Sequence, residues 1–171
     1  MTSRPEDSRR ILLFGNSGSG KSTLARHLCQ HHGLAHLDLD TLAWQSTSPP
    51  RREALAVSGA ALAEFTSTHR AWVIEGCYAD LLELAAPEAN EAIYLALPVA
   101  DCIANARSRP WEPHKYSTKA AQDANLEMLL SWIGDYESRD DTFSALAHRQ
   151  LFDAFDGRKS MHIRNGEYRD V

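Results

Sequence analysis

Gly15-Asn16-Ser17-Gly18-Ser19-Gly20-Lys21-Ser22-Thr23 comes directly after the apolar run Ile11–Phe14, and this stretch decides the fold. A strand followed by a tight loop of small residues allows successive backbone N–H groups to close around a phosphate. Lys21 adds positive charge at that point, and the hydroxyl of Ser22 suits Mg²⁺. We therefore predict that residues 15–23 bind a nucleoside triphosphate or diphosphate.

The segment after the loop predicts a helix. Leu24 and Leu28 lie four positions apart between Lys21 and about His32, which is the spacing of one helical face. The positive N-terminal end of such a helix faces the bound phosphates. The loop alone does not identify the reaction, because motors, GTPases, ATPases and small-molecule kinases share it.

Composition limits the class of protein. The chain has 171 residues, 43% of them hydrophobic, which fits one globular domain over residues 1–171 without a membrane-spanning segment. Residues 1–10 are polar and lack the apolar core of a secretory signal, so we expect a flexible tail and a cytoplasmic protein. The 18 Lys plus Arg and 23 Asp plus Glu give a net charge of −5, which disfavours nucleic-acid binding.

The cysteines and the clustered histidines do not indicate a disulfide framework or a metal site. Cys29, Cys77 and Cys102 form no C-x-x-C pair, so we interpret them as free thiols, with Cys77 either lining the site or simply packed. The clustered histidines are His31, His32 and His36. They lack further ligands at a matching spacing, and we interpret them as solvated histidines at a helix end.

Short apolar runs alternate with helical patterns along the chain, as in a parallel α/β fold. The predicted strands are Ile11–Phe14, Ala35–Leu39, Trp72–Glu75, Ala92–Leu97 and Ser160–Ile163. The first, third and fourth are expected to be fully buried. Further helices are predicted over residues 53–68, after Pro98, over residues 119–133 and around residues 143–155. We therefore predict three layers, with a five-stranded parallel sheet flanked by helices.

Two aspartates lie at the end of the second predicted strand, in His36-Leu37-Asp38-Leu39-Asp40. The alternation of a strand places Asp38 and Asp40 on the same side, at the sheet edge where the phosphate loop opens. Asp38 is suited to accept hydrogen bonds from Mg²⁺-bound water, and Asp40 to orient or deprotonate an acceptor hydroxyl. The alternative is a solvated pair of carboxylates at a strand end.

These motifs together resemble the shikimate-kinase and nucleoside-monophosphate-kinase branch of the P-loop kinases. The phosphate loop, His36-Leu37-Asp38, Trp44 and Trp72-Val73-Ile74-Glu75-Gly76-Cys77-Tyr78 are similar to those of small kinase-like proteins labelled adenylate kinase or DNA topology modulation protein. The resemblance implies a P-loop NTPase fold of the nucleoside-monophosphate-kinase type. Shikimate kinases carry a glycine triplet where this chain has residues 75–78, which disfavours shikimate as the acceptor.

Glu75 resembles a Walker B carboxylate because it follows three apolar residues of a predicted strand. This resemblance implies that Glu75 supports Mg²⁺ or its water shell. A structural role at the strand end is the alternative.

The resemblance also implies a short, mobile and basic lid over residues 107–119. The basic residues of this segment are Arg107, Arg109, Lys115 and Lys119, against the single carboxylate of Glu112. Closure of such arginines over the γ-phosphate would offset charge in the transition state and exclude water. A solvated basic turn is the alternative.

Other arginines are placed near the substrates by the same resemblance. Arg164 or Asn165, in the loop after the last predicted strand, is expected near the adenine. Arg51 and Arg52 suit an anionic acceptor, but an exposed helix start explains them as well. Arg139 suits a phosphate, with a surface ion pair as the alternative.

The leading hypothesis is a small-molecule kinase that uses ATP and Mg²⁺ and acts on a hydroxyl or a nucleoside monophosphate. The predicted catalytic residues are Lys21, Asp40, Arg107 and Arg109, and the predicted metal-binding residues are Ser22, Asp38 and Glu75. Asp40 favours a hydroxyl acceptor. The predicted partners are a small-molecule acceptor and no nucleic acid or membrane, in a monomer or homodimer.

The alternative hypothesis is a nucleotide-binding regulatory ATPase without a dedicated acceptor. The chain lacks an N-K-x-D guanine signature, which disfavours a GTPase switch. A role in modulating DNA, implied only by the label of some relatives, is disfavoured by the acidic composition.

Overall fold

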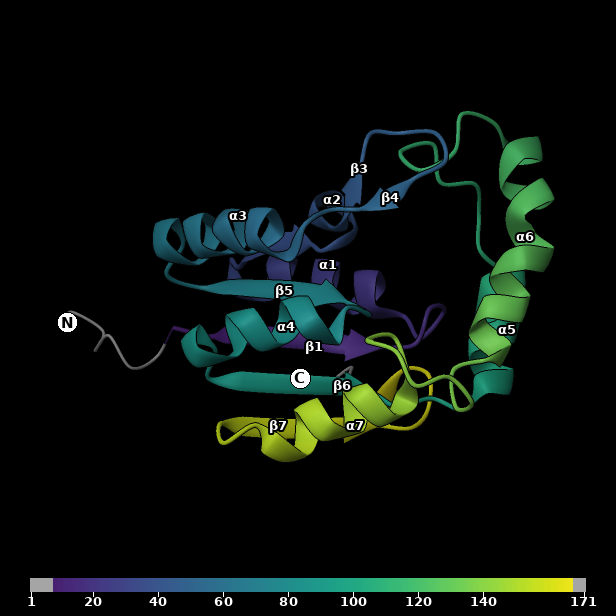
Figure 1. Cartoon of the computed structure of the whole chain (residues 1–171). Coiled ribbons are helices and arrows are strands. Elements are labelled where there is room, and N and C mark those ends of the chain that lie inside the picture. The colour runs from purple at the N-terminus through teal and green to yellow at the C-terminus, as the bar shows by residue number, and fades with distance from the viewer. Residues whose placement is uncertain (1–7, 168–171) are drawn as a thin grey trace.

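A five-stranded parallel sheet forms the centre of the computed structural model, which describes residues 8–167 (Figure 1). The strands are β1 (Arg10–Gly15), β2 (Ala35–Asp38), β5 (Trp72–Gly76), β6 (Glu91–Leu95) and β7 (Arg158–His162). Their order in the sheet is β2-β5-β1-β6-β7, and all neighbours run parallel. The predicted strands are confirmed, with ends that differ by one or two residues.

Helices cover both faces of the sheet, which confirms the predicted three layers. One face carries α1 (Lys21–His32), α5 (Val99–Arg107) and α6 (Lys119–Gly134). The other face carries α3 (Leu55–Thr68), α4 (Ala79–Ala85) and α7 (Ala145–Ala154). Strand β1 serves both cores, because Ile11 and Leu13 point into the first and Leu12 and Phe14 into the second.

Burial on both faces explains the continuous apolar runs of the central strands. Every residue of β5 and β6 is buried, as is every residue of β1 after Arg10. The expectation of full burial is therefore confirmed. The carboxyl ends of these strands point toward α5 and α6, so the loops that follow the strands gather at that edge (Figure 1).

Several short elements were not predicted. They are α2 (Asp40–Ala43), the antiparallel pair β3 (Trp44–Gln45) and β4 (Arg51–Arg52), α4 and a 3₁₀ turn, η2 (Ala86–Glu88). Asp40 begins α2, so the prediction that both aspartates lie on one strand is wrong. The physical reason is a turn: the Asp40 backbone N–H donates to Asp38 Oδ1 at 2.9 Å and the chain leaves the sheet.

The predicted N-terminal tail covers residues 1–10, of which residues 1–7 lie outside the described residues. Ser8–Arg10 are tied to the fold, so the prediction is wrong for these residues. Asn90 Nδ2 donates to the Ser8 carbonyl oxygen at 2.8 Å, and Arg9 Nη2 lies 2.7 Å from Glu91 Oε1. Arg10 already belongs to β1.

No helix within residues 8–167 is long and apolar enough to cross a membrane. The three cysteines are free, and Cys102 is buried. His36 was predicted to lie at a helix end, but it lies in strand β2.

Candidate active site

The phosphate loop connects β1 to α1 and is fixed by contacts with other elements. Gly18 has a φ of 78°, and a Cβ atom there would lie 2.4 Å from the carbonyl oxygen of Cys102, so a larger residue does not fit. Asn16 Nδ2 donates to the carbonyl oxygen of Ile133 at 3.2 Å. Lys21 Nζ donates to the Asn16 carbonyl oxygen at 2.7 Å, which holds the ammonium group against the loop. The loop thus presents positive charge and a helix N-terminus to one site.

Ser22, Glu75 and Asp38 lie together beside the loop. Ser22 Oγ donates to Glu75 Oε1 at 2.8 Å, and Glu75 faces Asp38 in the register of β5 and β2. His36 Nε2 lies 3.1 Å from the same Oε1 atom and donates to it when that nitrogen carries the proton. His36 is a functional-site neighbour that the sequence interpretation missed.

The surroundings shift the pKa values of the two carboxyl groups in opposite directions. Burial alone would raise the pKa of Glu75, which is 2% exposed, but the hydrogen bonds from His36 and Ser22 and the charge of Lys21 outweigh it. The pKa of Glu75 therefore lies below its ordinary value. Burial, followed by the negative charges of Glu75 and Asp40, raises the pKa of Asp38. A cation at this position would relieve the repulsion.

These oxygen atoms fit a partly protein-bound Mg²⁺. A hydroxyl and two carboxylates are ligands of the kind that Mg²⁺ takes. Within residues 8–167, no group of three or more His, Cys, Asp or Glu side chains could hold a metal ion. The donor set therefore suits an ion that also takes ligands from nucleotide phosphates and water.

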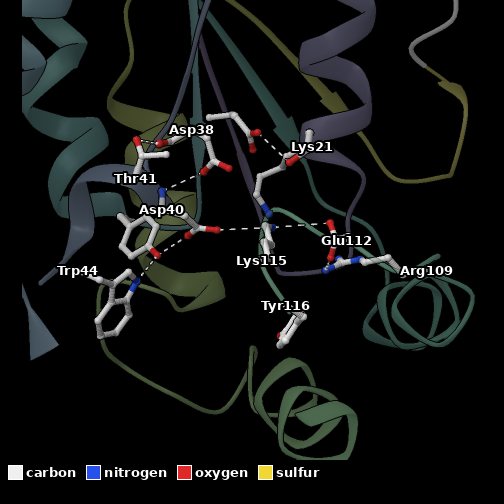
Figure 2. A network of polar contacts seen from close by, with 12 residues as sticks. Lys21, Asp38, Asp40, Thr41, Trp44, Arg109, Glu112, Lys115 and Tyr116 are labelled. Atoms are coloured by element: carbon white, nitrogen blue, oxygen red, sulfur yellow. Dashed lines mark hydrogen bonds and ion pairs between the residues drawn. The ribbon is translucent and has the colours of Figure 1, made fainter. Parts of the chain in front are cut away.

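Asp40 lies farther along the same cleft, and both of its carboxylate oxygens have partners (Figure 2). The Tyr78 hydroxyl donates to Oδ1 and accepts a hydrogen bond from Trp44 Nε1 at 2.8 Å. Lys115 Nζ lies 3.8 Å from Oδ2. Burial and then the charge of Asp40 raise the pKa of Tyr78, so its hydroxyl stays protonated and remains a donor. The Asp40 side chain is 48% exposed and can be reached from the cleft.

One continuous cleft of about 730 Å³ joins the phosphate loop to the two aspartates. It is lined by loop residues from Ser17 onward, by Asp38, Asp40 and Glu75, and by residues 108–116. Its volume lies within the range of about 300–1,000 Å³ that is typical of small-molecule sites. The arrangement gives room for a phosphate-bearing ligand and a second molecule beside Asp40.

The segment between α5 and α6, predicted as a basic lid, forms one wall of the cleft. The backbone N–H of Glu112 donates to Gln122 Oε1 at 2.8 Å, and Gln122 Nε2 donates to the Pro110 carbonyl oxygen at 3.0 Å. Arg109 and Lys115 both form ion pairs with Glu112, at 3.4 and 3.9 Å. The positive charge that the sequence suggests for this segment is therefore partly neutralised within the segment itself.

The sequence that contains the first four strands of the sheet and the phosphate loop matches a known family. A sequence model described as an AAA domain matches residues 11–96, which is half of the chain. The chain belongs to this AAA domain family. The AAA domain match runs from β1 to just beyond β6 and includes the phosphate loop, Asp38, Asp40 and Glu75. With the sheet order and the loop after β1, it confirms the predicted P-loop α/β fold.

Solved structures with some similarity to this AAA domain chain include three kinases. A sugar kinase from Janibacter sp. HTCC2649, unliganded, is 17% identical with a TM-score of 0.46 over 90% of this chain and 84% of that chain. Shikimate kinase from Acinetobacter baumannii in complex with shikimate is 21% identical, with a TM-score of 0.43 over 85% and 92%. Shikimate kinase from Bacteroides thetaiotaomicron is 14% identical, with a TM-score of 0.47 over 85% and 97%. The search of curated proteins gave no match.

Two predicted arginines lie outside the cleft of this AAA domain chain. Arg107 ends α5 and Arg164 follows β7, and both are exposed and absent from the cleft lining, unlike Arg109. Asn165 does line the cleft and exchanges amide hydrogen bonds of 2.8 and 3.1 Å with Asn105. Asn105 Nδ2 also donates to the Gly18 carbonyl oxygen at 2.8 Å. A lone asparagine in an amphipathic helix gives no sequence signal, so Asn105 was missed.

Two of the remaining arginines of interest, Arg52 and Arg139, have side-chain partners within the protein. Arg52 Nη2 lies 3.1 Å from Asp80 Oδ2, and its guanidinium carbon lies 5.0 Å from the ring centroid of Tyr78. Arg139 donates to the Trp132 carbonyl oxygen at 2.6 Å, and its guanidinium carbon lies 3.5 Å from the centroid of the Trp132 ring. Among the described residues, Arg139 does not form the suggested surface ion pair. Arg51 is exposed on β4 and does not line the cleft.

A buried hydrogen-bond network holds the backbone of a segment that lines the cleft, and the sequence interpretation missed this network as well. His148 Nε2 donates to the Cys77 carbonyl oxygen at 2.8 Å, and Nδ1 accepts from the Tyr136 hydroxyl at 2.7 Å. The Tyr94 hydroxyl completes the chain at 2.9 Å from that of Tyr136. Burial lowers the pKa of His148 to about 4, so the ring is neutral as these bonds require. The network fixes the backbone between Glu75 and Tyr78, and burial raises the pKa of the Cys77 thiol to about 11.

Proposed function

We propose that this chain is a kinase that uses ATP and Mg²⁺ to phosphorylate a hydroxyl group of a small molecule. The observation that carries the proposal is the cleft itself, in which Lys21 at the phosphate loop and the exposed carboxylate of Asp40 line one continuous space. A phosphoryl donor and an acceptor hydroxyl must meet in such a space.

The phosphate loop is assigned to the donor. Lys21 and the N–H groups of residues 15–23 bind the β- and γ-phosphates. Ser22 would bind Mg²⁺ directly, and Asp38 and Glu75 would bind its water molecules. When bound, the metal neutralises charge on the phosphate oxygens. Asn105 and Asn165 are assigned to the base end of the nucleotide because they line the cleft beside Gly18.

Asp40 is assigned as the general base. Its carboxylate accepts the proton of the acceptor hydroxyl while that oxygen forms a bond to the γ-phosphorus. The bond between the γ-phosphorus and the bridging oxygen breaks, and ADP leaves. Tyr78 donates to the Asp40 carboxylate and so orients it, while the indole N–H of Trp44 in turn orients Tyr78.

The cleft beside Asp40 favours this proposal over a regulatory ATPase. A regulator needs a nucleotide site and a partner surface but no carboxylate beside room for a second molecule. The experiment that tests the proposal incubates the protein with Mg²⁺, γ-labelled ATP and a panel of nucleosides, nucleotides, sugars and hydroxy acids. We expect label in one class of acceptor, detected by mass spectrometry. Nucleotide binding with no labelled acceptor would instead support the regulatory ATPase.

A further inference from the structure

The end of the cleft around Asp40, here called the acceptor end, carries balanced charge. It holds two carboxylates, Asp40 and Glu112, and two cations, Lys115 and Arg109. Their formal charges sum to zero. The ligand that this end complements most simply therefore carries no net charge.

Each cation of the acceptor end is already paired with a carboxylate. Lys115 Nζ lies between two of them, 3.8 Å from Asp40 and 3.9 Å from Glu112, and Arg109 lies 3.4 Å from Glu112. These side chains are between 19% and 48% exposed, so the pairs are partly shielded from water. A phosphate or carboxylate group on the acceptor would have to break one of these pairs and then lie beside the released carboxylate.

Among the described residues that line the cleft, the other lysine and arginine side chains are Lys21 and Arg26, and neither belongs to the acceptor end. Lys21 is assigned to the donor phosphates, and Arg26 donates to the Ser22 carbonyl oxygen beside the metal end. Arg52 is paired with Asp80 and does not line the cleft. The arrangement differs from one that captures an anion, which needs donors without a competing carboxylate.

Uncharged surfaces complete the acceptor end. Trp111 is 44% exposed and lines the cleft with Tyr116 and Leu129. The indole N–H of Trp111 donates to the Tyr116 carbonyl oxygen at 3.0 Å, and Asn125 donates to the Tyr116 hydroxyl at 2.9 Å. The polar atoms of these rings therefore have partners, and the apolar ring faces remain for contact with a ligand.

We infer that the acceptor is an uncharged polyhydroxy compound, such as a sugar, a polyol or a nucleoside, and not a nucleoside monophosphate or a hydroxy acid. This inference rests on the proposed function and narrows its acceptor. It assigns Glu112 as a specificity-determining residue, because Glu112 is paired with Arg109 and Lys115, the two cations that an anionic acceptor would need.

Binding to matched pairs of compounds tests the inference. The protein, saturated with Mg²⁺ and a non-hydrolysable ATP analogue, is titrated with glucose or gluconate, with adenosine or AMP, and with cytidine or CMP. We expect the uncharged member of at least one pair to bind, and its anionic partner to bind at least about tenfold more weakly. An anionic member that binds at least as tightly as its uncharged partner would overturn the inference. Failure of the proposed function is a separate result: either the ATP analogue does not bind, or it binds and neither member of any pair does.

A charge variant gives a second test. Glu112→Gln keeps the side-chain shape and releases Arg109 and Lys115, so the preference for the uncharged member should fall at least about tenfold. Glu127→Gln is the matched control, because it removes the same charge from an exposed residue of α6 that does not line the cleft. An unchanged preference in Glu112→Gln would contradict the assigned role of Glu112.

Discussion

The two ends of the cleft are built in different ways. The phosphate end comes from the contiguous residues 15–23, in which backbone N–H groups and one lysine carry most of the binding capacity. The acceptor end joins side chains from separate segments: Asp40 on α2, Tyr78 after β5, and Glu112 and Lys115 between α5 and α6. The first end suits a ligand common to many proteins, and the second can change its specificity through single side chains.

The largest expected effect comes from the phosphate end. Lys21→Ala removes the ammonium group that faces the phosphates, so we expect ATP affinity to fall about 100-fold and phosphoryl transfer about 1,000-fold. Calorimetry with an ATP analogue and the labelled-ATP assay measure the two effects. Lys119→Ala is the control, because Lys119 pairs with Asp123 and does not line the cleft. Full affinity in Lys21→Ala would refute the assignment of the loop.

The next effect is on the free energy of unfolding, through the buried His148 next to the cleft. The pKa of His148 is about 4 in the folded chain, against an ordinary value of 6.5. Between pH 6.5 and pH 4, His148 takes up a proton in the unfolded chain but not in the folded chain. The contribution of the neutral, buried His148 to stability is therefore complete above pH 6.5 and is lost as the pH falls to 4. The loss is about 3 kcal/mol in the free energy of unfolding.

Denaturant unfolding at several pH values measures this loss. His148→Gln should flatten the pH dependence between 6.5 and 4.5, whatever its effect on absolute stability. His31→Gln, at an exposed residue of α1, should keep the slope of the unsubstituted chain. Equal slopes in all three proteins would show that His148 is not the buried neutral group described above.

A smaller effect is expected at the metal end. Glu75→Gln keeps the shape of the side chain but removes the charge beside Ser22 and Asp38, so the Mg²⁺ concentration for half-maximal transfer should rise about ten- to 100-fold. Titration of activity with Mg²⁺ measures the change. An unaltered Mg²⁺ requirement would place Glu75 in a purely structural role.

The smallest effect is expected from the orientation of Asp40. Tyr78→Phe removes the hydroxyl that donates to Asp40 and accepts from Trp44, so kcat should fall about tenfold while ATP affinity stays the same. Steady-state kinetics and calorimetry separate the two quantities. A loss of ATP affinity equal to the loss of kcat would indicate a general distortion of the cleft instead.

The same contrast explains how much the sequence could predict. The strands and the phosphate loop were predictable because each depends on consecutive residues. Asp40 was assigned to the correct cleft on the wrong element, since a turn after Asp38 begins α2. The pairing of Arg109 and Lys115 with Glu112 could not be predicted, because it depends on how the lid segment folds. Asn105 and His148 act through contacts with residues 87 and 71 positions away, which no local pattern reveals.

The central claim is that Asp40 takes part in phosphoryl transfer at a site distinct from the phosphate end. Asp40→Asn keeps the size of the side chain and removes the base, so its single-turnover rate of transfer from labelled ATP tests this claim most directly. We predict a rate about 100- to 1,000-fold below that of the unsubstituted protein, with ATP affinity changed by less than about threefold. Asp123→Asn, on the exposed side of α6, should leave both quantities unaltered. An unchanged rate in Asp40→Asn would contradict the account.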